Sequence, residues 1–223
     1  MNQNFLRLIR SGATAEIADA VHADPPLAAW RDAQGVSALL WSIYSGQAMV
    51  RDFLLTSLGE HSIPLDIFEA AAIGDDVRLA ALLQEHPEQA NHHSGDGWTP
   101  LHLAAAFGTP TCVATLLQAG ANVAAVSTNA QASQPLHAAL ALGRNPEIIR
   151  LLLEHGAKPN ATQAGGFTPI FSAASANRID LAELLLAHSA RAHHRCDAGK
   201  SPADFARERG HTELADWLEA RPV

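Results

Sequence analysis

The sequence has few aromatic residues, few cysteines and no long apolar run, and each shortage excludes a class of protein. Aromatic residues make up 5% of the chain, which disfavours a β-rich fold because these side chains are enriched in strands. Two cysteines, Cys112 and Cys196, are too few for the disulfide framework of a small secreted domain. No stretch approaches the ~18 apolar residues of a membrane span, and the N-terminal residues lack the apolar core of a signal peptide. We therefore expect a cytoplasmic protein with two reduced thiols.

Positive charge is also scarce. The 15 Lys and Arg residues are outnumbered by 23 Asp and Glu residues, and the formal net charge is −8. Proteins that bind nucleic acid or anionic membranes present clustered basic side chains, and this sequence shows no such cluster. The composition therefore predicts a partner that is neither nucleic acid nor membrane. The 48% of apolar residues is typical of an ordered globular protein.

A repeated segment predicts the fold class. Thr99-Pro100-Leu101-His102 has counterparts that start at residues 134, 168 and 201, which gives spacings of 35, 34 and 33 residues. Nine residues after each start stands a glycine or asparagine, the residue types that most cheaply adopt the left-handed conformation at a helix end. These expected helix terminators are Gly108, Gly143, Asn177 and Gly210. The same interval separates Gln3 from Gly12, Ser37 from Gly46, and Leu65 from Gly74.

Each repeat is expected to contain two short helices. Thr99 is a good N-cap, Pro100 fits the first helical position, and Leu116 and Leu117 follow in a second apolar segment. Helices of about eight residues are unstable alone and gain stability by stacking on their neighbours. The sequence therefore predicts an all-α solenoid of about seven helix pairs that forms a single domain over residues 1–223. Its units start near residues 3, 37, 65, 99, 134, 168 and 201.

The best-formed repeat resembles an ankyrin repeat nearly in full. Its residues are Gly97-Trp98-Thr99-Pro100-Leu101-His102-Leu103-Ala104-Ala105, then Gly108, and then residues 116–123. Residues 201–223 resemble a C-terminal capping repeat. Residues 1–94 follow the spacing of the ankyrin repeat with a degenerate sequence. In this family short β-hairpin fingers project between the units, and fingers and first helices line a concave face that usually binds proteins. The resemblance implies a scaffold, adaptor or inhibitor that binds a protein partner, with no enzymatic activity and no cofactor, and we expect a monomer.

Two units depart from the standard length. The second unit, residues 37–64, has only 28 residues, which leaves no room for a finger before the third unit. The connection over residues 121–133 is two residues longer than the standard spacing, so that finger should be enlarged. We therefore predict one interruption and one enlargement in the row of fingers.

Aromatic and apolar residues at outward-facing positions are the candidate partner-binding residues. On the ankyrin pattern Trp98 and Phe167 fall on fingers, and Val36 takes the same place one finger earlier. Four others fall on the outward side of first helices: Trp41, Tyr44, Phe107 and Leu142. Exposed aromatic side chains of this kind mark interaction hot spots. The alternative is that the rings pack against neighbouring repeats within the stack.

Histidines provide the second hypothesis. His102 and His137 stand where ankyrin repeats carry a structural histidine. The pairs His92-His93 and His193-His194 lie in connections, where adjacent histidines have the freedom to approach a metal. The alternative function is therefore a small-ligand or metal-binding regulatory module. No phosphate loop, dinucleotide fingerprint or nucleophile elbow accompanies these residues, so catalysis is not expected.

Overall fold

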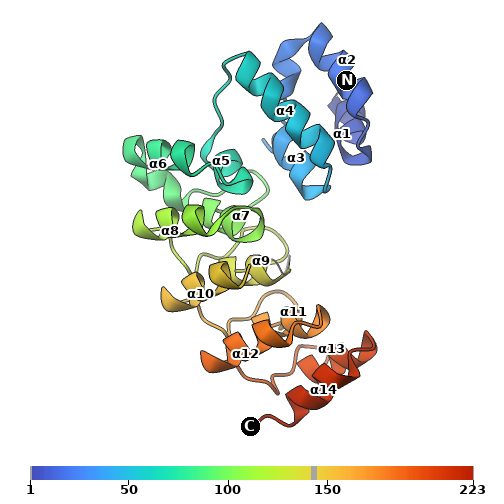
Figure 1. Cartoon of the computed structure of the whole chain (residues 1–223), viewed down its shortest axis with the longest axis vertical. Helices are drawn as coiled ribbons and strands as arrows, with labels where there is room; N and C mark the ends of the chain where they lie inside the picture. Colours follow the sequence, from blue (N-terminus) through green and yellow to red (C-terminus); the bar gives the residue numbers. More distant parts are fainter. Residues whose placement is uncertain (1, 142–144, 223) are drawn as a thin grey trace.

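The structure is a computed structural model, and it describes residues 2–141 and 145–222. Within these residues the secondary structure is helical, and no β-strand is formed. The helices stack as pairs in chain order, so the molecule is elongated and its two termini lie at opposite ends (Figure 1). The predicted all-α solenoid of seven helix pairs is confirmed.

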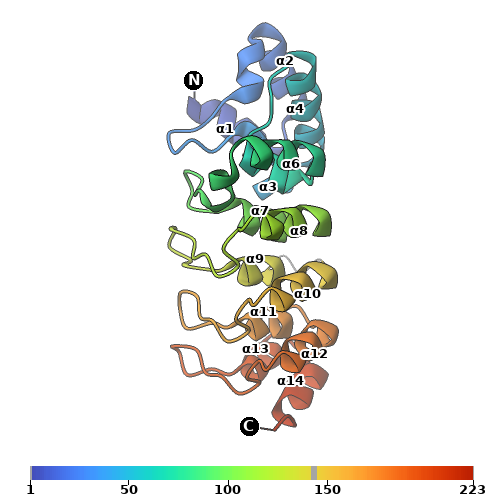
Figure 2. The same ribbon diagram turned by 90° about the vertical axis from the view of Figure 1, so that its left-hand side faces the viewer.

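The first and second helices of the pairs form separate rows, and the second helices line one side of the stack (Figure 2). The first helices are α1 (Asn2–Ser11), α3 (Ala38–Tyr44), α5 (Ile67–Ile73), α7 (Pro100–Phe107), α9 (Pro135–Ala141), α11 (Pro169–Ser175) and α13 (Pro202–Glu208). The second helices are α2 (Thr14–Ala23), α4 (Ala48–Glu60), α6 (Asp76–Glu85), α8 (Pro110–Gln118), α10 (Pro146–Glu154), α12 (Ile179–Ala187) and α14 (Thr212–Glu219). Two short 3-10 helices, η1 (Pro25–Ala29) and η2 (Pro87–Asn91), follow α2 and α6.

The start of α7 shows how the repeat motif builds the fold. The N–H of His102 donates to the Thr99 hydroxyl oxygen, and the N–H of Thr99 donates to His102 Nδ1 over 3.3 Å. The other ring nitrogen, Nε2, lies 2.9 Å from the carbonyl oxygen of Ser133 in the next finger. His137 repeats this contact with the carbonyl oxygen of Ala161 over 3.0 Å. The structural role predicted for these two histidines is confirmed.

Gly108 ends α7 for a reason that differs from the predicted one. Its φ of −83° and ψ of −150° are extended, so the predicted left-handed conformation is wrong at this position. A Cβ atom on Gly108 would press against the carbonyl oxygen of Ala71 in α5 and lie 3.0 Å from the Cα of Ala104. The end of α7 therefore packs on the backbone of α5 because residue 108 has no side chain. Asn177 and Gly210 are left-handed as predicted, and Gly143 lies outside the described residues.

The connections between units form the predicted fingers on one side of the stack (Figure 2). A typical finger is closed by a backbone hydrogen bond across five residues, such as that from the Ser94 N–H to the Trp98 carbonyl oxygen, 2.8 Å. The enlarged finger is closed by the bond from Ser127 to Ser133, as its longer connection predicts. Consecutive fingers are also joined, since the Thr128 N–H donates to the Gly97 carbonyl oxygen over 3.0 Å.

The short second unit produces a joint in the stack. Residues 61–66 lead from α4 to α5 without a finger, as predicted. A Cβ atom on Gly95 would press against the carbonyl oxygen of Gln34, so the fingers on either side of the gap lie in contact. The helices α1 to α4 stand out of line with the helices that follow (Figure 1).

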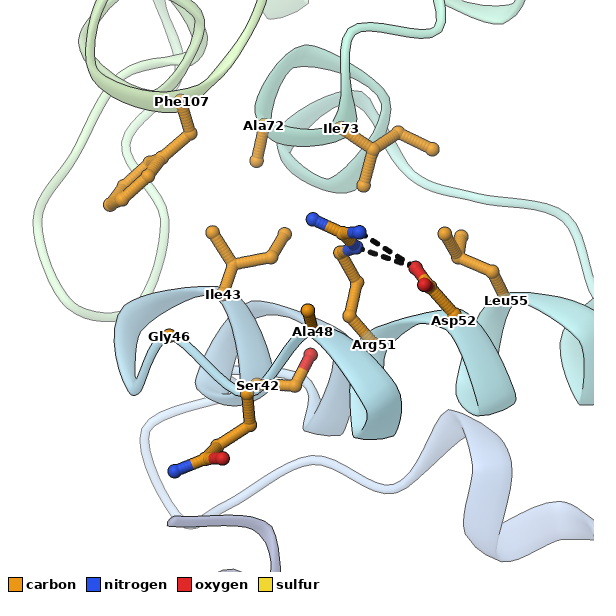
Figure 3. A pocket seen from close by; sticks show the side chains of 11 residues that line it. Ser42, Ile43, Gly46, Ala48, Arg51, Asp52, Leu55, Ala72, Ile73 and Phe107 are labelled. Carbon is orange, nitrogen blue, oxygen red and sulfur yellow. Dashed lines mark hydrogen bonds and ion pairs between the residues drawn. The ribbon is translucent and has the colours of Figure 1, made fainter. Parts of the chain in front are cut away.

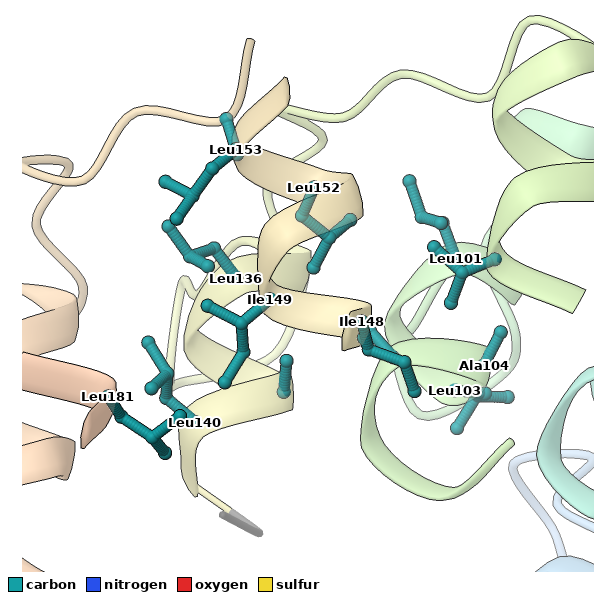
Figure 4. Close-up of a cluster of buried hydrophobic side chains, with 14 of the residues drawn as sticks. Leu101, Leu103, Ala104, Leu136, Leu140, Ile148, Ile149, Leu152, Leu153 and Leu181 are labelled. Atoms are coloured by element: carbon teal, nitrogen blue, oxygen red, sulfur yellow. The ribbon is translucent and has the colours of Figure 1, made fainter. Parts of the chain in front are cut away.

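Buried apolar side chains form two clusters that meet at this joint. One cluster draws its buried residues from positions 5–58, and the other draws them from positions 36–218. Figure 4 shows part of the second cluster, in which Leu136 of α9 and Ile149 of α10 belong to one repeat, and Leu101 and Leu181 to the repeats on either side. Trp41 and Ile43 of α3 pack against both clusters, so α3 links the N-terminal helices to the rest of the stack.

Arg31 provides a polar link across the joint. Its guanidinium lies 2.9 Å from a carboxylate oxygen of Asp66 and 3.3 Å from one of Glu69, both at the start of α5. The Glu69 side chain is only 5% exposed. Burial and, to a lesser degree, the neighbouring Asp66 carboxylate raise the pKa of Glu69, whereas Arg31 lowers it. Arg31 therefore compensates a buried negative charge that α5 carries to the joint.

Replacing Arg31 by alanine is expected to lower the free energy of unfolding by about 1–2 kcal/mol at neutral pH. The loss of a partner from a buried ion pair costs more than this, but the Arg31 side chain is 40% exposed and partly screened. Without Arg31 the pKa of Glu69 rises further. A carboxyl whose pKa is raised by folding contributes stability that is present below its ordinary pKa and lost as the pH rises through the raised value. The deficit should therefore shrink in mild acid.

Urea unfolding at neutral and mildly acidic pH checks this expectation. Arg51→Ala is the matched control, since it removes an exposed ion pair with Asp52 inside the N-terminal helices. That change should cost about 0.5 kcal/mol or less. An Arg31→Ala deficit that is the same at both pH values would contradict the role assigned to Glu69.

Two further sequence expectations concern the thiols and the membrane. Cys112 and Cys196 are both buried and both free. Across residues 2–141 and 145–222, each helix is too short or too polar to cross a bilayer.

Candidate functional site

A groove of about 590 Å³ runs between the fingers and the row of first helices. Three fingers contribute Asp96, Trp98, Ala130, Gln131, Ser133, Gln163, Ala164 and Phe167. The first helices contribute Tyr44, His102, Leu103, Ala106, Phe107, His137, Ala138 and Ala141. The term groove is used below for the surface formed by these residues. Its volume is within the usual range for protein ligand sites.

The groove brings together four of the seven residues predicted to face outward: Tyr44, Trp98, Phe107 and Phe167. Trp41 lies beside it, with its ring centroid 5.9 Å from that of Tyr44 and its indole N–H donating to Asp32 over 2.9 Å. Leu142 lies outside the described residues. Val36 is 1% exposed and belongs to the buried cluster drawn from positions 36–218, so its expected outward position is wrong.

The four aromatic rings are half-buried. Each lines the groove and also packs against the buried cluster drawn from positions 36–218. The Phe167 ring lies 5.3 Å from both the Phe171 and the Phe205 rings in edge-to-face contact. The Trp98 ring lies 5.2 Å from that of His102. The same ring can therefore pack within the stack and still present a surface to a partner, so the two interpretations drawn from the sequence do not exclude each other.

Tyr44 limits the groove at its N-terminal end. Its ring centroid lies 5.7 Å from that of Phe107, although α3 and α7 belong to units that are separated by the α5–α6 pair. This contact exists where the finger between the second and third units is missing and the N-terminal helices are out of line (Figure 1). The short second unit therefore gives the groove an aromatic end wall.

Asp96 is the one carboxylate that lines the groove among the described residues. Its Oδ1 accepts a hydrogen bond from the Ser94 hydroxyl, 2.5 Å, which fixes the side chain on its finger. The histidines of the groove are neutral near neutral pH, since burial lowers the pKa of His102 to about 4 and also lowers that of His137. Burial and then the nearby Asp96 carboxylate raise the pKa of Tyr44. The groove therefore combines aromatic rings with a single negative charge.

The sequence pattern did not identify Asp96, Gln131 or Gln163 as groove residues. All three are on fingers, whose positions depend on contacts between neighbouring units. The Asp96 carbonyl oxygen, for example, accepts a hydrogen bond from Asn129 of the next finger, 3.1 Å. Asp96 lies in the turn of its finger, where no periodicity in the sequence indicates which way a side chain faces.

A second hollow of about 480 Å³ lies at the joint between α3–α4 and α5 (Figure 3). Ile43, Ala48 and Leu55 line it on one side and Ile73 on the other. Its lining includes Arg51, whose guanidinium pairs with the adjacent Asp52 over 2.8 Å. Because Asp52 compensates the charge of Arg51 within the hollow, the hollow is a weaker candidate for a binding site than the groove.

The loop histidines hold the connections in place. His93, His193 and His194 place Nε2 at 3.2, 2.8 and 3.0 Å from the carbonyl oxygens of Val126, Arg221 and Gly166 respectively. In the part of the chain that the structure describes, no three His, Cys, Asp or Glu side chains gather in an arrangement suited to a metal ion. The geometry therefore gives the metal-binding hypothesis no support.

Comparison with known proteins finds one family. A family model described as ankyrin repeats (3 copies) matches residues 67–163, and one described as ankyrin repeats (many copies) matches residues 170–219. The rat cyclin-dependent kinase 4 inhibitor B is 37% identical over 123 residues, which cover 54% of this chain and 90% of the relative.

Two longer relatives match only in part. The mouse B-cell lymphoma 3 protein homolog is 30% identical over 158 residues, which cover 70% of this chain and 34% of the relative. The mouse ankyrin repeat and SOCS box protein 16 is 40% identical over 115 residues, which cover 48% of this chain and 25% of the relative. The chain thus spans about a third or less of the length of these two proteins.

Proposed function

The chain belongs to the ankyrin-repeat family, and from this premise we propose that it binds a protein partner in the groove between its fingers and first helices. Ankyrin repeats generally mediate protein–protein interactions. The observation that carries the proposal is the groove itself, in which Tyr44, Trp98, Phe107 and Phe167 surround a floor of small side chains. The proposed role is that of a monomeric scaffold, adaptor or inhibitor without catalytic activity.

The composition of the groove supports a protein ligand. Aromatic side chains in a partly desolvated pocket are the commonest hot spots of protein interfaces. Ala106, Ala138 and Ala141 leave room above the first helices for a partner's side chains. Gln131 and Gln163 place amide groups along the finger side, where they can orient an inserted segment. Such a surface suits an extended segment or loop of another protein.

The relatives favour recognition as the mode of action. The rat relative, which is matched over 90% of its length, is named as a kinase inhibitor. An inhibitor and an adaptor both act by occupying a surface of another protein, and neither needs a catalytic group. We propose the same mode of action here and leave the partner to be identified by capture.

Replacing Ala141 by arginine is expected to abolish capture of the partner while leaving the fold intact. Ala141 is exposed at the end of α9 and lines the groove, so a long side chain there fills the space above the helix. Exposed substitutions usually change the free energy of unfolding by less than about 0.5 kcal/mol. Ala80→Arg is the matched control, because Ala80 is also exposed but lies on α6 in the row of second helices.

The experiment is affinity capture from native lysate with the wild-type chain and both variants as bait, followed by quantitative mass spectrometry. The proposal expects a protein that is retained by the wild-type and Ala80→Arg chains and lost from Ala141→Arg. Equal recovery with all three baits, at equal unfolding stability, would place the interaction elsewhere on the molecule.

A further inference from the structure

The Tyr44 end of the groove contains a charge without an ionic partner. Among the described residues no Lys, Arg or His nitrogen lies within ion-pair distance of the Asp96 carboxylate. Its Oδ1 accepts a hydrogen bond from the Ser94 hydroxyl. The Tyr44 hydroxyl is buried beside this carboxylate. A cationic group of a ligand would give this carboxylate the ionic partner that it lacks within the chain.

Aromatic rings surround this carboxylate. Tyr44, Trp98 and Phe107 line the same end of the groove, and the Tyr44 and Phe107 ring centroids are 5.7 Å apart. The face of an aromatic ring attracts a cation, and the attraction is stronger where water is displaced. Within the chain itself, the Arg10 guanidinium lies 5.7 Å from the centroid of the neighbouring Trp41 ring. Aromatic rings and a carboxylate at one site favour a cationic ligand over a neutral or anionic one.

We propose that the Tyr44 end of the groove binds an arginine side chain of the partner, which stacks on the aromatic rings and pairs with Asp96. This inference rests on the proposed function, because it names the chemistry of the partner that the groove accepts. Arginine fits better than lysine, since its planar guanidinium stacks on aromatic faces and is less strongly hydrated than an ammonium group. Its planar fork of N–H groups can donate to the Asp96 carboxylate through two parallel hydrogen bonds. The net charge of −8 also favours approach of a basic segment.

The test uses the full chain and a displayed library of random peptides. Enriched peptides are remade with each arginine replaced by citrulline, which keeps the shape of the side chain and removes its charge. Binding of both forms is measured by calorimetry to the wild-type chain and to Asp96→Asn, which keeps an acceptor oxygen for Ser94. Asp197→Asn is the matched control, because Asp197 is an exposed carboxylate on the last finger and does not line the groove.

The proposal expects the enriched peptides to share an arginine whose change to citrulline weakens binding to the wild-type chain by about tenfold. Asp96→Asn should weaken the arginine form by a similar factor and bring the two forms close together, whereas Asp197→Asn should leave the preference intact. Peptides that bind with no arginine, or equally well as citrulline forms, and that are lost in Trp98→Ser would overturn this inference but support the groove. Failure to obtain any peptide sensitive to Trp98→Ser would count against the proposed function as well.

Discussion

Replacing Gly108 by alanine is expected to lower the free energy of unfolding by about 3 kcal/mol. The added methyl group would press against the carbonyl oxygen of Ala71, a buried backbone atom of α5, and would also lie 3.0 Å from the Cα of Ala104. Backbone atoms in the middle of a stack cannot move aside as a flexible side chain can, so α5 and α7 must separate. Forcing extra volume into a packed interior costs about 1–3 kcal/mol, and a rigid obstacle puts this site at the upper end.

Gly46→Ala is the matched control for this prediction. Gly46 takes the same place in the second unit, but it has a φ of +67° and no atom lies within 4 Å of an added Cβ. Alanine at Gly46 should therefore cost only the strain of the left-handed conformation, about 1 kcal/mol. Urea unfolding of both variants separates the two causes. A Gly108→Ala deficit no larger than that of Gly46→Ala would show that the contact between α5 and α7 is looser than described.

Replacing Phe167 by serine is expected to reduce both stability and partner binding. The ring packs edge to face on Phe171 and Phe205, with both centroids 5.3 Å away. Loss of a half-buried aromatic ring with two such contacts should lower the free energy of unfolding by about 2–3 kcal/mol. This is more than the sequence pattern alone indicates, because an outward finger position predicts a small contribution to the core. Since the ring also lines the groove, binding should weaken by about 2 kcal/mol or more.

Phe205→Ser separates the two effects. Phe205 is half-buried in the same aromatic cluster, but it does not line the groove. It should cost a similar free energy of unfolding and leave the dissociation constant of the captured partner unchanged. Chemical unfolding and calorimetry on the same preparations measure both quantities. Equal weakening of binding by both variants would mean that partner binding depends on the stability of the stack rather than on contact with Phe167.

Much of the fold was predictable because the repeat is encoded locally. Thr99, Pro100 and His102 form their helix cap within four residues, so the sequence motif is sufficient to predict the geometry of the cap. The missing and enlarged fingers followed from chain length alone. The left-handed conformation predicted for Gly108 was wrong. Glycine is required there because the chain packs closely on Ala71, a residue of the previous unit. A pattern within one repeat carries no information on how closely two repeats approach.

The candidate site was predictable only in part for the same reason. Trp98 and Phe167 occupy finger positions that the family pattern turns outward, and both line the groove. Tyr44 reaches Phe107 across an intervening unit, a contact that follows from the misalignment at the joint. Asp96 belongs to the same end of the groove, yet a single carboxylate in a loop has no distinctive sequence signal. The position of the carboxylate among the aromatic rings therefore depends on contacts between units that are distant in the sequence.

The most direct test of the central claim is to map the captured partner on the chain by amide chemical shifts. The isotope-labelled chain is titrated with the partner, and shifts are compared between the groove side and the row of second helices. Binding in the groove predicts that the largest changes fall within residues 94–107, 130–141 and 163–167. Changes confined to α6, α8, α10 and α12, with the groove residues unaffected, would contradict the account.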